Sequence, residues 1–204
     1  MFGKVASIGA ALALALAAAP AAAVNFPVTG TITVNGSSGD LPAGGSFGDS
    51  TYDGATGVLS AGKFTFPQSS VVIPVQGLGN VTVTYRLTQN APSSAQVASD
   101  GVAAMTPVAM TLSVLWVAFP IPISTAPCNF TPIDLDLAGT GAAGGLDLED
   151  REFSVPPTTD SCAGYASQIN GALTGSSNSI TLHLAGDFTP PPDTDKIFID
   201  GFDG

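Results

Sequence analysis

From residue 26 the chain alternates between apolar and hydroxyl-bearing side chains. In residues 26–34, Phe26, Val28, Ile32 and Val34 fall on one face, and threonines occupy the positions that would face the other way. A period of two with many β-branched residues is typical of a strand that is buried on one side. This opening segment therefore predicts a half-buried β-strand, which ends at the turn-forming residues 35–40.

The same pattern continues along the chain and predicts further strands. Residues 53–57 contain Asp53, Gly54 and Gly57 and predict a turn between a strand at residues 44–52 and a strand at residues 58–66. The predicted strands cover residues 44–52, 58–66, 71–75, 81–87, 130–137 and 179–185. A single short helix is predicted within residues 162–173, where Asp160 and Ser161 provide a potential cap.

Residues 108–123 form the most apolar stretch that follows the N-terminus. Hydrophobicity alone would permit a membrane span, but Pro107, Pro120 and Pro122 together with the β-branched residues favour a buried central strand. Many short strands separated by Gly, Pro and Asn predict an all-β domain over residues 24–188. An antiparallel β-sandwich is the expected architecture, with a barrel as the alternative.

Both ends of the chain differ from this domain. Lys4, the uncharged apolar residues 6–19 and the small residues 21–23 have the layout of a cleaved bacterial signal peptide, so the mature protein is expected to begin at Val24. No stable membrane span is expected after cleavage. Residues 189–204 form a Pro-rich linker and a C-terminal tail. The expected location is extracellular or at the cell surface, with the periplasm as an alternative.

The chain has two cysteines, Cys128 and Cys162, and both lie in the exported part. A pair of cysteines in an oxidising compartment is usually bonded, so a disulfide between them is predicted. The alternative is a thiol nucleophile beside a spare cysteine. That alternative needs a basic partner, which this sequence scarcely provides.

The amino-acid composition limits the kinds of partner that the protein can bind. The formal net charge is −11 and charged residues make up 10% of the chain. Such an anionic surface repels the phosphate backbone, so no nucleic-acid partner is expected. The sequence does not identify the partner, and an envelope or surface component is one candidate.

Candidate catalytic groups are few. His183 is the single histidine, and no Gly-x-Ser-x-Gly motif accompanies it. One histidine and two bonded cysteines are too few to ligate zinc, and no Gly-rich phosphate loop is present. We therefore predict no enzymatic activity and no cofactor.

Carboxylates are the abundant functional groups. Asp134 and Asp136 share one face of a predicted strand, and a second group follows a Gly/Ala connector at residues 141–145. The second group surrounds Arg151 and consists of Asp147, Glu149, Asp150 and Glu152. We expect a solvated acidic loop over residues 147–152. Ca²⁺ binding and a glycosidase acid/base pair are the alternatives left open.

Two segments resemble known groups of proteins. An apolar strand enters a Pro-rich piece before Cys128, Cys162 precedes a short helix, and residues 178–184 close the domain. This arrangement resembles uncharacterised secreted bacterial β-rich proteins with a paired cysteine. Separately, Ile197-Phe198-Ile199-Asp200-Gly201-Phe202-Asp203 resembles a short C-terminal signature of exported Gram-negative proteins. The second resemblance implies a sorting or surface-delivery tag, although this chain ends in Asp-Gly.

Two functions follow from these features. The expected one is a non-enzymatic secreted or cell-surface domain with a structural or adhesive role. The alternative is an extracellular binding module for an apolar or lipid-like ligand, because residues 108–123 carry more apolar side chains than a connector needs. A ligand carrier requires some of these side chains to line a cavity.

Overall fold

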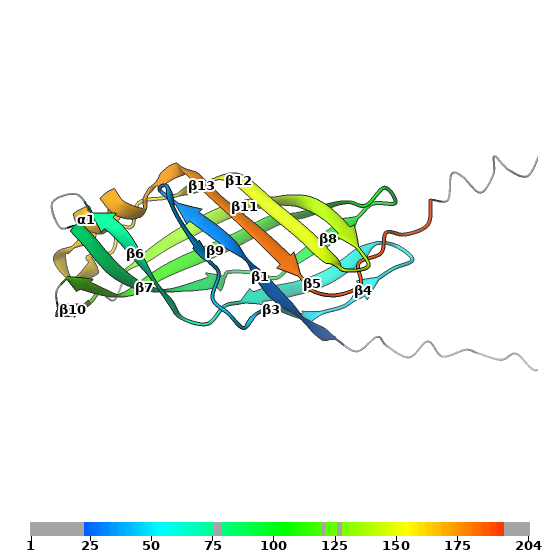
Figure 1. Ribbon diagram of the computed structural model, residues 1–204, viewed down its shortest axis with the longest axis horizontal. Helices are drawn as coiled ribbons and strands as arrows, with labels where there is room; N and C mark the ends of the chain where they lie inside the picture. Colours follow the sequence, from blue (N-terminus) through cyan, green and yellow to red (C-terminus); the bar gives the residue numbers. More distant parts are fainter. Residues whose placement is uncertain (1–22, 76–78, 120, 126–127, 194–204) are drawn as a thin grey trace, which may run out of the picture.

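The computed structural model describes residues 23–75, 79–119, 121–125 and 128–193. The predicted signal peptide, apart from its last residue, lies outside the described residues. So does the C-terminal signature within residues 194–204. The described ends of the chain lie at the same end of the molecule, opposite the helix (Figure 1).

The described part of the chain is an all-β fold, as predicted, and it is a barrel rather than a sandwich (Figure 1). Eight antiparallel strands close in the order β9-β11-β12-β13-β1-β3-β5-β7, and β7 pairs back to β9. The eight are β1 (Val24–Val34), β3 (Gly45–Ser50), β5 (Val58–Thr65), β7 (Gly79–Gln89), β9 (Val102–Phe119), β11 (Asn129–Ala142), β12 (Gly145–Val155) and β13 (Gly175–Leu184).

Shorter elements extend this ring. They are β2 (Ser37–Asp40), β4 (Tyr52–Asp53), β6 (Ser69–Val75), β8 (Ser93–Val97), β10 (Ile121–Ser124), the 3₁₀-helix η1 (Cys162–Gly164) and α1 (Ala166–Leu173). The predicted helix is therefore present as η1 and α1, which are separated by Tyr165, and Cys162 and Ala163 within η1 have positive φ.

Two long strands explain why the sheet closes on itself. β9 has 18 residues and β11 has 14, so each changes neighbours along its length. One edge of β9 pairs with β8 and then β7, and the other edge pairs with β11. A staggered register of this kind is what barrel closure requires. The expectation of short strands was wrong because β9 begins at Val102, upstream of the apolar segment.

Glycines allow strands to approach closely where the barrel wall bends. At Gly30 in β1 an added Cβ would collide with the carbonyl oxygen of Thr181, and at Gly139 in β11 with that of Asp147. A side chain at either position would push neighbouring strands apart. These two glycines therefore permit the curvature of the wall around β13 and β12.

The side chain of Gln89 completes the barrel between β5 and β7, which pair through only one residue of each strand in the described ladder. On the edge that faces away from β3 and β4, β5 pairs with β7 through Thr65 and Thr88, and otherwise with β8. Gln89, which is 2% exposed, accepts a hydrogen bond from the Phe64 N–H at 2.6 Å and donates to Ser93 Oγ at 2.8 Å. The Gln89 side chain thus replaces ladder hydrogen bonds that the diverging strands cannot make.

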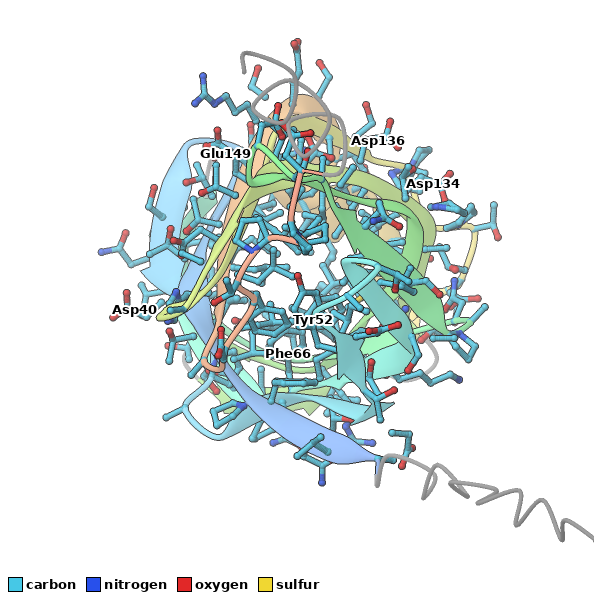
Figure 2. All side chains as sticks on the ribbon, turned by 90° about the vertical axis from the view of Figure 1, so that its right-hand side faces the viewer. Asp40, Tyr52, Phe66, Asp134, Asp136 and Glu149 are labelled. Carbon is cyan, nitrogen blue, oxygen red and sulfur yellow. A yellow bond between two sulfur atoms is a disulfide. The ribbon has the colours of Figure 1, made fainter. Side chains whose placement is uncertain are left out.

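The interior differs between the two halves of the barrel. The half near β4 and β8 is filled with aromatic rings, including Phe47 and Phe64 with centroids 4.8 Å apart and Tyr52 and Phe188 at 5.1 Å. Figure 2 shows Tyr52 and Phe66 inside the ring of strands. The opposite half is covered at its end by η1 and α1, which bury Ile169 and Leu173.

Cys128 and Cys162 lie at disulfide-bonding distance, with Cα atoms 4.7 Å apart, as the sequence predicted. Both residues are buried. Because Cys128 immediately precedes β11 and Cys162 begins η1, the bond ties the covering helices to the barrel wall.

The acidic segment 147–152 lies in strand β12, so the expectation of a loop was wrong. Leu146 and Leu148 are buried, whereas Asp147 points outward between them. Residues 141–145, expected to be a Gly/Ala connector, end β11, make the hairpin turn and start β12. The two-residue alternation around Leu146 and Leu148 is interrupted by an irregularity between Asp150 and Phe153, and it resumes at Phe153 and Val155.

Candidate functional site

The half of the barrel beneath α1 contains an apolar cavity of about 170 Å³. Met110, Leu112 and Val114 from β9 line it, and they belong to the apolar segment that the sequence analysis singled out. Phe153 from β12 and Leu173 from α1 close other parts of the wall. The stacked and tilted rings that fill the other half are not part of this lining, which consists mainly of aliphatic side chains.

The cavity reaches the surface between two edge strands. Among the described strands, β2 pairs with β1 and β6 pairs with β7, and neither has a second neighbour. Both strands contribute to the lining, including the exposed residues Asp40 in β2 and Ser70 in β6. The gap between β2 and β6 is called the mouth below.

Half-buried apolar side chains lie just inside the mouth. They are Ile32 and Val34 at the end of β1 and Val71 in β6. Asp40 is the one charged residue among the described residues that line the cavity, and Figure 2 shows it at the margin of the ring. Asp40 lies opposite Thr31 in the pairing of β1 with β2, so its carboxylate is on the outer face of the wall. The mouth therefore joins an apolar interior to polar residues of β2 and β6.

A buried asparagine fixes the hairpin that forms one side of the mouth. Asn178 is 1% exposed and donates to the carbonyl oxygens of Phe153 and Gly175, both at 2.9 Å. Its own oxygen accepts the Asn35 N–H at 2.8 Å. Asn35 and Gly36 have positive φ, as a tight hairpin turn between β1 and β2 requires. The position of β2 is thus set by β12 and β13.

Tyr85 is the aromatic residue that β7 contributes to the wall. Its side chain is 8% exposed. Burial raises the pKa of the Tyr85 phenol, and a hydrogen bond with Ser69 opposes part of that shift. Tyr85 therefore remains neutral in its folded surroundings and has a hydroxyl partner in β6.

The carboxylates considered for metal or acid/base chemistry act mainly as acceptors within the fold. Asp150 accepts the backbone N–H of Asp136 and of Glu152, each at 2.9 Å. Asp136 accepts the hydroxyl of Thr106 at 2.7 Å. The first of these bonds joins β11 to β12 beyond the point where their ladder ends. These carboxylates stabilise a diverging pair of strands.

No group of three or more His, Cys, Asp or Glu side chains suited to a metal ion occurs in the described ranges. Asp134, Asp136 and Glu149 lie on the outside of the ring in Figure 2, and none of them lines the cavity. Glu149 pairs with Arg151 on the surface. The arrangement therefore favours neither the Ca²⁺ site nor the glycosidase pair.

His183 lies on the outer face of β13, opposite Asp147 of β12. Its Nδ1 is 2.6 Å from Asp147 Oδ1, and the two side chains are 42% and 69% exposed. Gly145 leaves space for the imidazole, because an added Cβ would overlap the ring. This pair is a cross-strand contact on the outer surface, away from the cavity lining.

The sequence indicated residues 108–123 as a candidate cavity lining, but it did not predict the mouth between β2 and β6. The Ser-Ser-Gly-Asp sequence of β2 has the composition of a turn, and residues 35–40 were expected to end the first strand rather than to form a hairpin. No local signal marks Asp40 as different from the other exposed carboxylates. Its place beside the cavity depends on where β6 lies.

Comparisons with family models, with curated proteins and with solved structures find nothing that matches this chain. Within the described residues, no helix has the length and apolar character needed to cross a membrane.

Proposed function

We propose that the protein is an extracellular module that binds a small apolar ligand in the hollow half of its barrel. The observation that carries this proposal is the apolar cavity that opens between β2 and β6. Met110, Leu112 and Val114 supply part of its wall from the segment whose excess hydrophobicity suggested a carrier.

The volume of the cavity limits the ligand. At about 170 Å³ it is close to the apolar cavity of about 150 Å³ that binds benzene or xenon in another protein. It is smaller than the roughly 300–1,000 Å³ of sites for drug-sized molecules. The ligand that fits is therefore a single aromatic ring or a short alkyl chain.

Toluene is a suitable first probe. We expect toluene to raise the melting temperature and to shift the methyl NMR signals of Met110 and Leu112, because both side chains line the cavity. Val114→Phe places a ring in the same space and should abolish these shifts. The matched control is Val102→Phe, since Val102 is 56% exposed on β9 and should leave binding unchanged.

Folding of the filled variant must be verified without ligand. Val114→Phe should retain the dispersed methyl spectrum of the parent protein and a single cooperative thermal transition. A folded Val114→Phe variant that still responds to toluene would contradict the proposal. So would the parent protein if its spectrum does not respond to toluene.

The disulfide is compatible with an extracellular or periplasmic location. We propose export through the predicted signal peptide 1–23, and surface delivery through residues 189–204. Intact mass of the exported protein should give a chain beginning at Val24. Deleting residues 189–204 and fractionating the cells tests the tail, because unchanged distribution would contradict a sorting role.

A structural or adhesive role at the cell surface is the second candidate. It is favoured by hydroxyl pairs on the outer face, such as Thr31 with Thr181 at 2.9 Å and Thr33 with Ser38 at 2.7 Å. These side chains form a row of hydroxyl groups across β1, β2 and β13. Replacing Thr31 and Thr181 with lysine should weaken attachment to cells or envelope fractions without altering toluene binding.

A further inference from the structure

The polar side chains that face the cavity indicate which polar group its ligand carries. We infer that the ligand is a small uncharged molecule whose carbonyl oxygen accepts a hydrogen bond from the Tyr85 hydroxyl. This inference rests on the proposed function, and it adds one polar group to the apolar ligand.

Two polar residues of the lining point away from the cavity. Asp40 lies opposite Thr31, whose hydroxyl bonds Thr181 on the outer face. Ser70 lies opposite Thr84, and their hydroxyls are 2.8 Å apart on the exposed side of β6 and β7. The described lining therefore presents no charged side chain to the interior of the cavity.

Hydroxyl groups are the polar side chains that face inward. Tyr85 alternates on β7 with Val83 and Leu87, and all three are buried and line the cavity. Ser37 of β2 faces the same way, because it lies opposite Val34 of the lining. Ser37 is half-buried at the mouth, whereas Tyr85 is 8% exposed. Tyr85 is therefore the inward hydroxyl that water reaches less.

An uncharged interior selects for an uncharged ligand. Moving an ionic group from water into apolar surroundings without a counter-ion is strongly unfavourable. A neutral polar group can enter such a site if it finds a hydrogen-bonding partner there. The cavity therefore suits a molecule that is apolar except for one neutral group.

Tyr85 has a hydrogen bond to donate to that group. Ser69 lies opposite Tyr85 in the pairing of β6 with β7, and the two side chains are hydrogen-bonded. Burial raises the pKa of the Tyr85 phenol and this bond opposes the rise, as a bond donated by Ser69 to the phenol oxygen does. A phenol that accepts from Ser69 still has its own O–H to donate. A carbonyl oxygen accepts hydrogen bonds and donates none, so it matches this O–H.

Two ligands of nearly the same shape isolate the hydrogen bond. Acetophenone and α-methylstyrene share a phenyl ring, and the carbonyl oxygen of the first is replaced by a methylene group in the second. Both should bind the parent protein in calorimetric titrations. Tyr85→Phe should weaken acetophenone binding by about three- to ten-fold, as for a neutral hydrogen bond, and should leave α-methylstyrene binding unchanged. Benzoate, which carries a charged carboxylate on the same ring, should bind more weakly than acetophenone.

The carbonyl stretching frequency of bound acetophenone is a readout that packing alone does not reproduce. Infrared difference spectra with carbonyl-labelled acetophenone should show a lower frequency in the parent protein than in an alkane solvent. In Tyr85→Phe the frequency should return towards the alkane value. An unshifted frequency in the parent protein would overturn the inference without recourse to any variant.

Tyr52→Phe is the matched control, because it removes a phenol hydroxyl that lies outside the cavity lining and bonds the Thr189 carbonyl. It should change neither the affinities nor the carbonyl frequency. Both variants should keep a single cooperative thermal transition.

The outcomes separate this inference from the proposed function. Equal acetophenone affinity in Tyr85→Phe and the parent, or an equal loss for both ligands, would overturn the role of the Tyr85 hydroxyl and leave the apolar site standing. Benzoate binding as tight as that of acetophenone would overturn the preference for an uncharged ligand. Failure of toluene, acetophenone and α-methylstyrene alike would overturn the apolar site and this inference together.

Discussion

At the residue scale, Gln89 occupies the position where the ladder between β5 and β7 is interrupted. Its amide bonds to the Phe64 N–H and, at 2.6 Å, to the Ala91 carbonyl, and it also reaches Ser93. Ser93 in turn donates to the Pro107 carbonyl at 2.7 Å. This buried chain of hydrogen bonds links β5, β7, β8 and β9 where the barrel closes.

Gln89→Leu should lower the free energy of unfolding by about 2–4 kcal/mol, because it leaves buried backbone groups without partners. Chemical denaturation of the purified protein measures the change. Gln96→Leu is the control. Gln96 also donates to backbone carbonyls, of Thr56 and Val97, but it is exposed and water can replace its bonds. A loss no larger for Gln89→Leu than for Gln96→Leu would contradict the role of Gln89 in closure.

Tyr52 determines part of the response to alkaline pH. Burial is the main cause that raises the pKa of its phenol, and the negative charges of Asp187 and Asp53 raise it further. The Tyr52 hydroxyl donates to the Thr189 carbonyl at 2.8 Å. The phenol ionises more readily in the unfolded chain than in the folded protein. Its stabilising effect is therefore complete below the ordinary pKa of 10.0 and is lost as pH rises through the folded pKa.

We expect Tyr52→Phe to make the decline in unfolding free energy above pH 10 shallower than in the parent protein. Denaturation curves at several alkaline pH values provide the measurement. Tyr85→Phe serves as a comparison, because burial raises the pKa of that phenol too. The assignment to Tyr52 is wrong if its Phe variant declines as steeply as the parent.

At the scale of elements, the covering helices depend on the disulfide. Cys162 begins η1, and Leu173 at the end of α1 belongs to the cavity wall. Asp160, just before η1, also accepts the Asn129 N–H at 2.7 Å. The bond between Cys128 and Cys162 therefore helps to hold the end of the barrel over the cavity.

Replacing both cysteines with serine should reduce the free energy of unfolding by about 3–4 kcal/mol, as the chain-entropy model predicts for a loop spanning 34 residues. Amide hydrogen exchange should accelerate most in η1 and α1, whereas β3 and β5 in the aromatic half should change least. Uniform acceleration over the barrel would show that the bond has no particular connection to the covering helices.

At the scale of the whole molecule, like charges repel across an acidic surface. The formal net charge is −11, and the surface contacts of Arg151 with Glu149 and of His183 with Asp147 are exposed. Exposed pairs contribute little to stability, because water and salt screen them. Repulsion that extends over the whole surface should therefore outweigh the attraction within these pairs.

Added potassium chloride should accordingly raise the melting temperature, because it screens the net repulsion more than it weakens the pairs. Thermal denaturation over a series of salt concentrations measures this dependence. Asp134→Lys reduces the net charge at an exposed position and should reduce the salt dependence. A melting temperature that falls with salt would mean that the pairs dominate.

Much of the fold followed from local patterns. Alternation over residues 26–34 and 179–185 identified β1 and β13, and the prolines around residues 108–123 correctly argued for a strand. Cys128 and Cys162 were recognised from composition and compartment. These features depend on a residue and its near neighbours, and the printed sequence contains that information.

What the sequence by itself determined is the all-β class, the short helix, the cysteine pair and the apolar excess in β9. Only the tertiary structure decided that the sheet closes into a barrel, that Asp147 lies on a strand, and that Asp40 borders a cavity. Closure, register and cavity position depend on which side chains meet across strands far apart in the chain. A period of two specifies the face of each side chain, but it does not specify the strand that the side chain will meet.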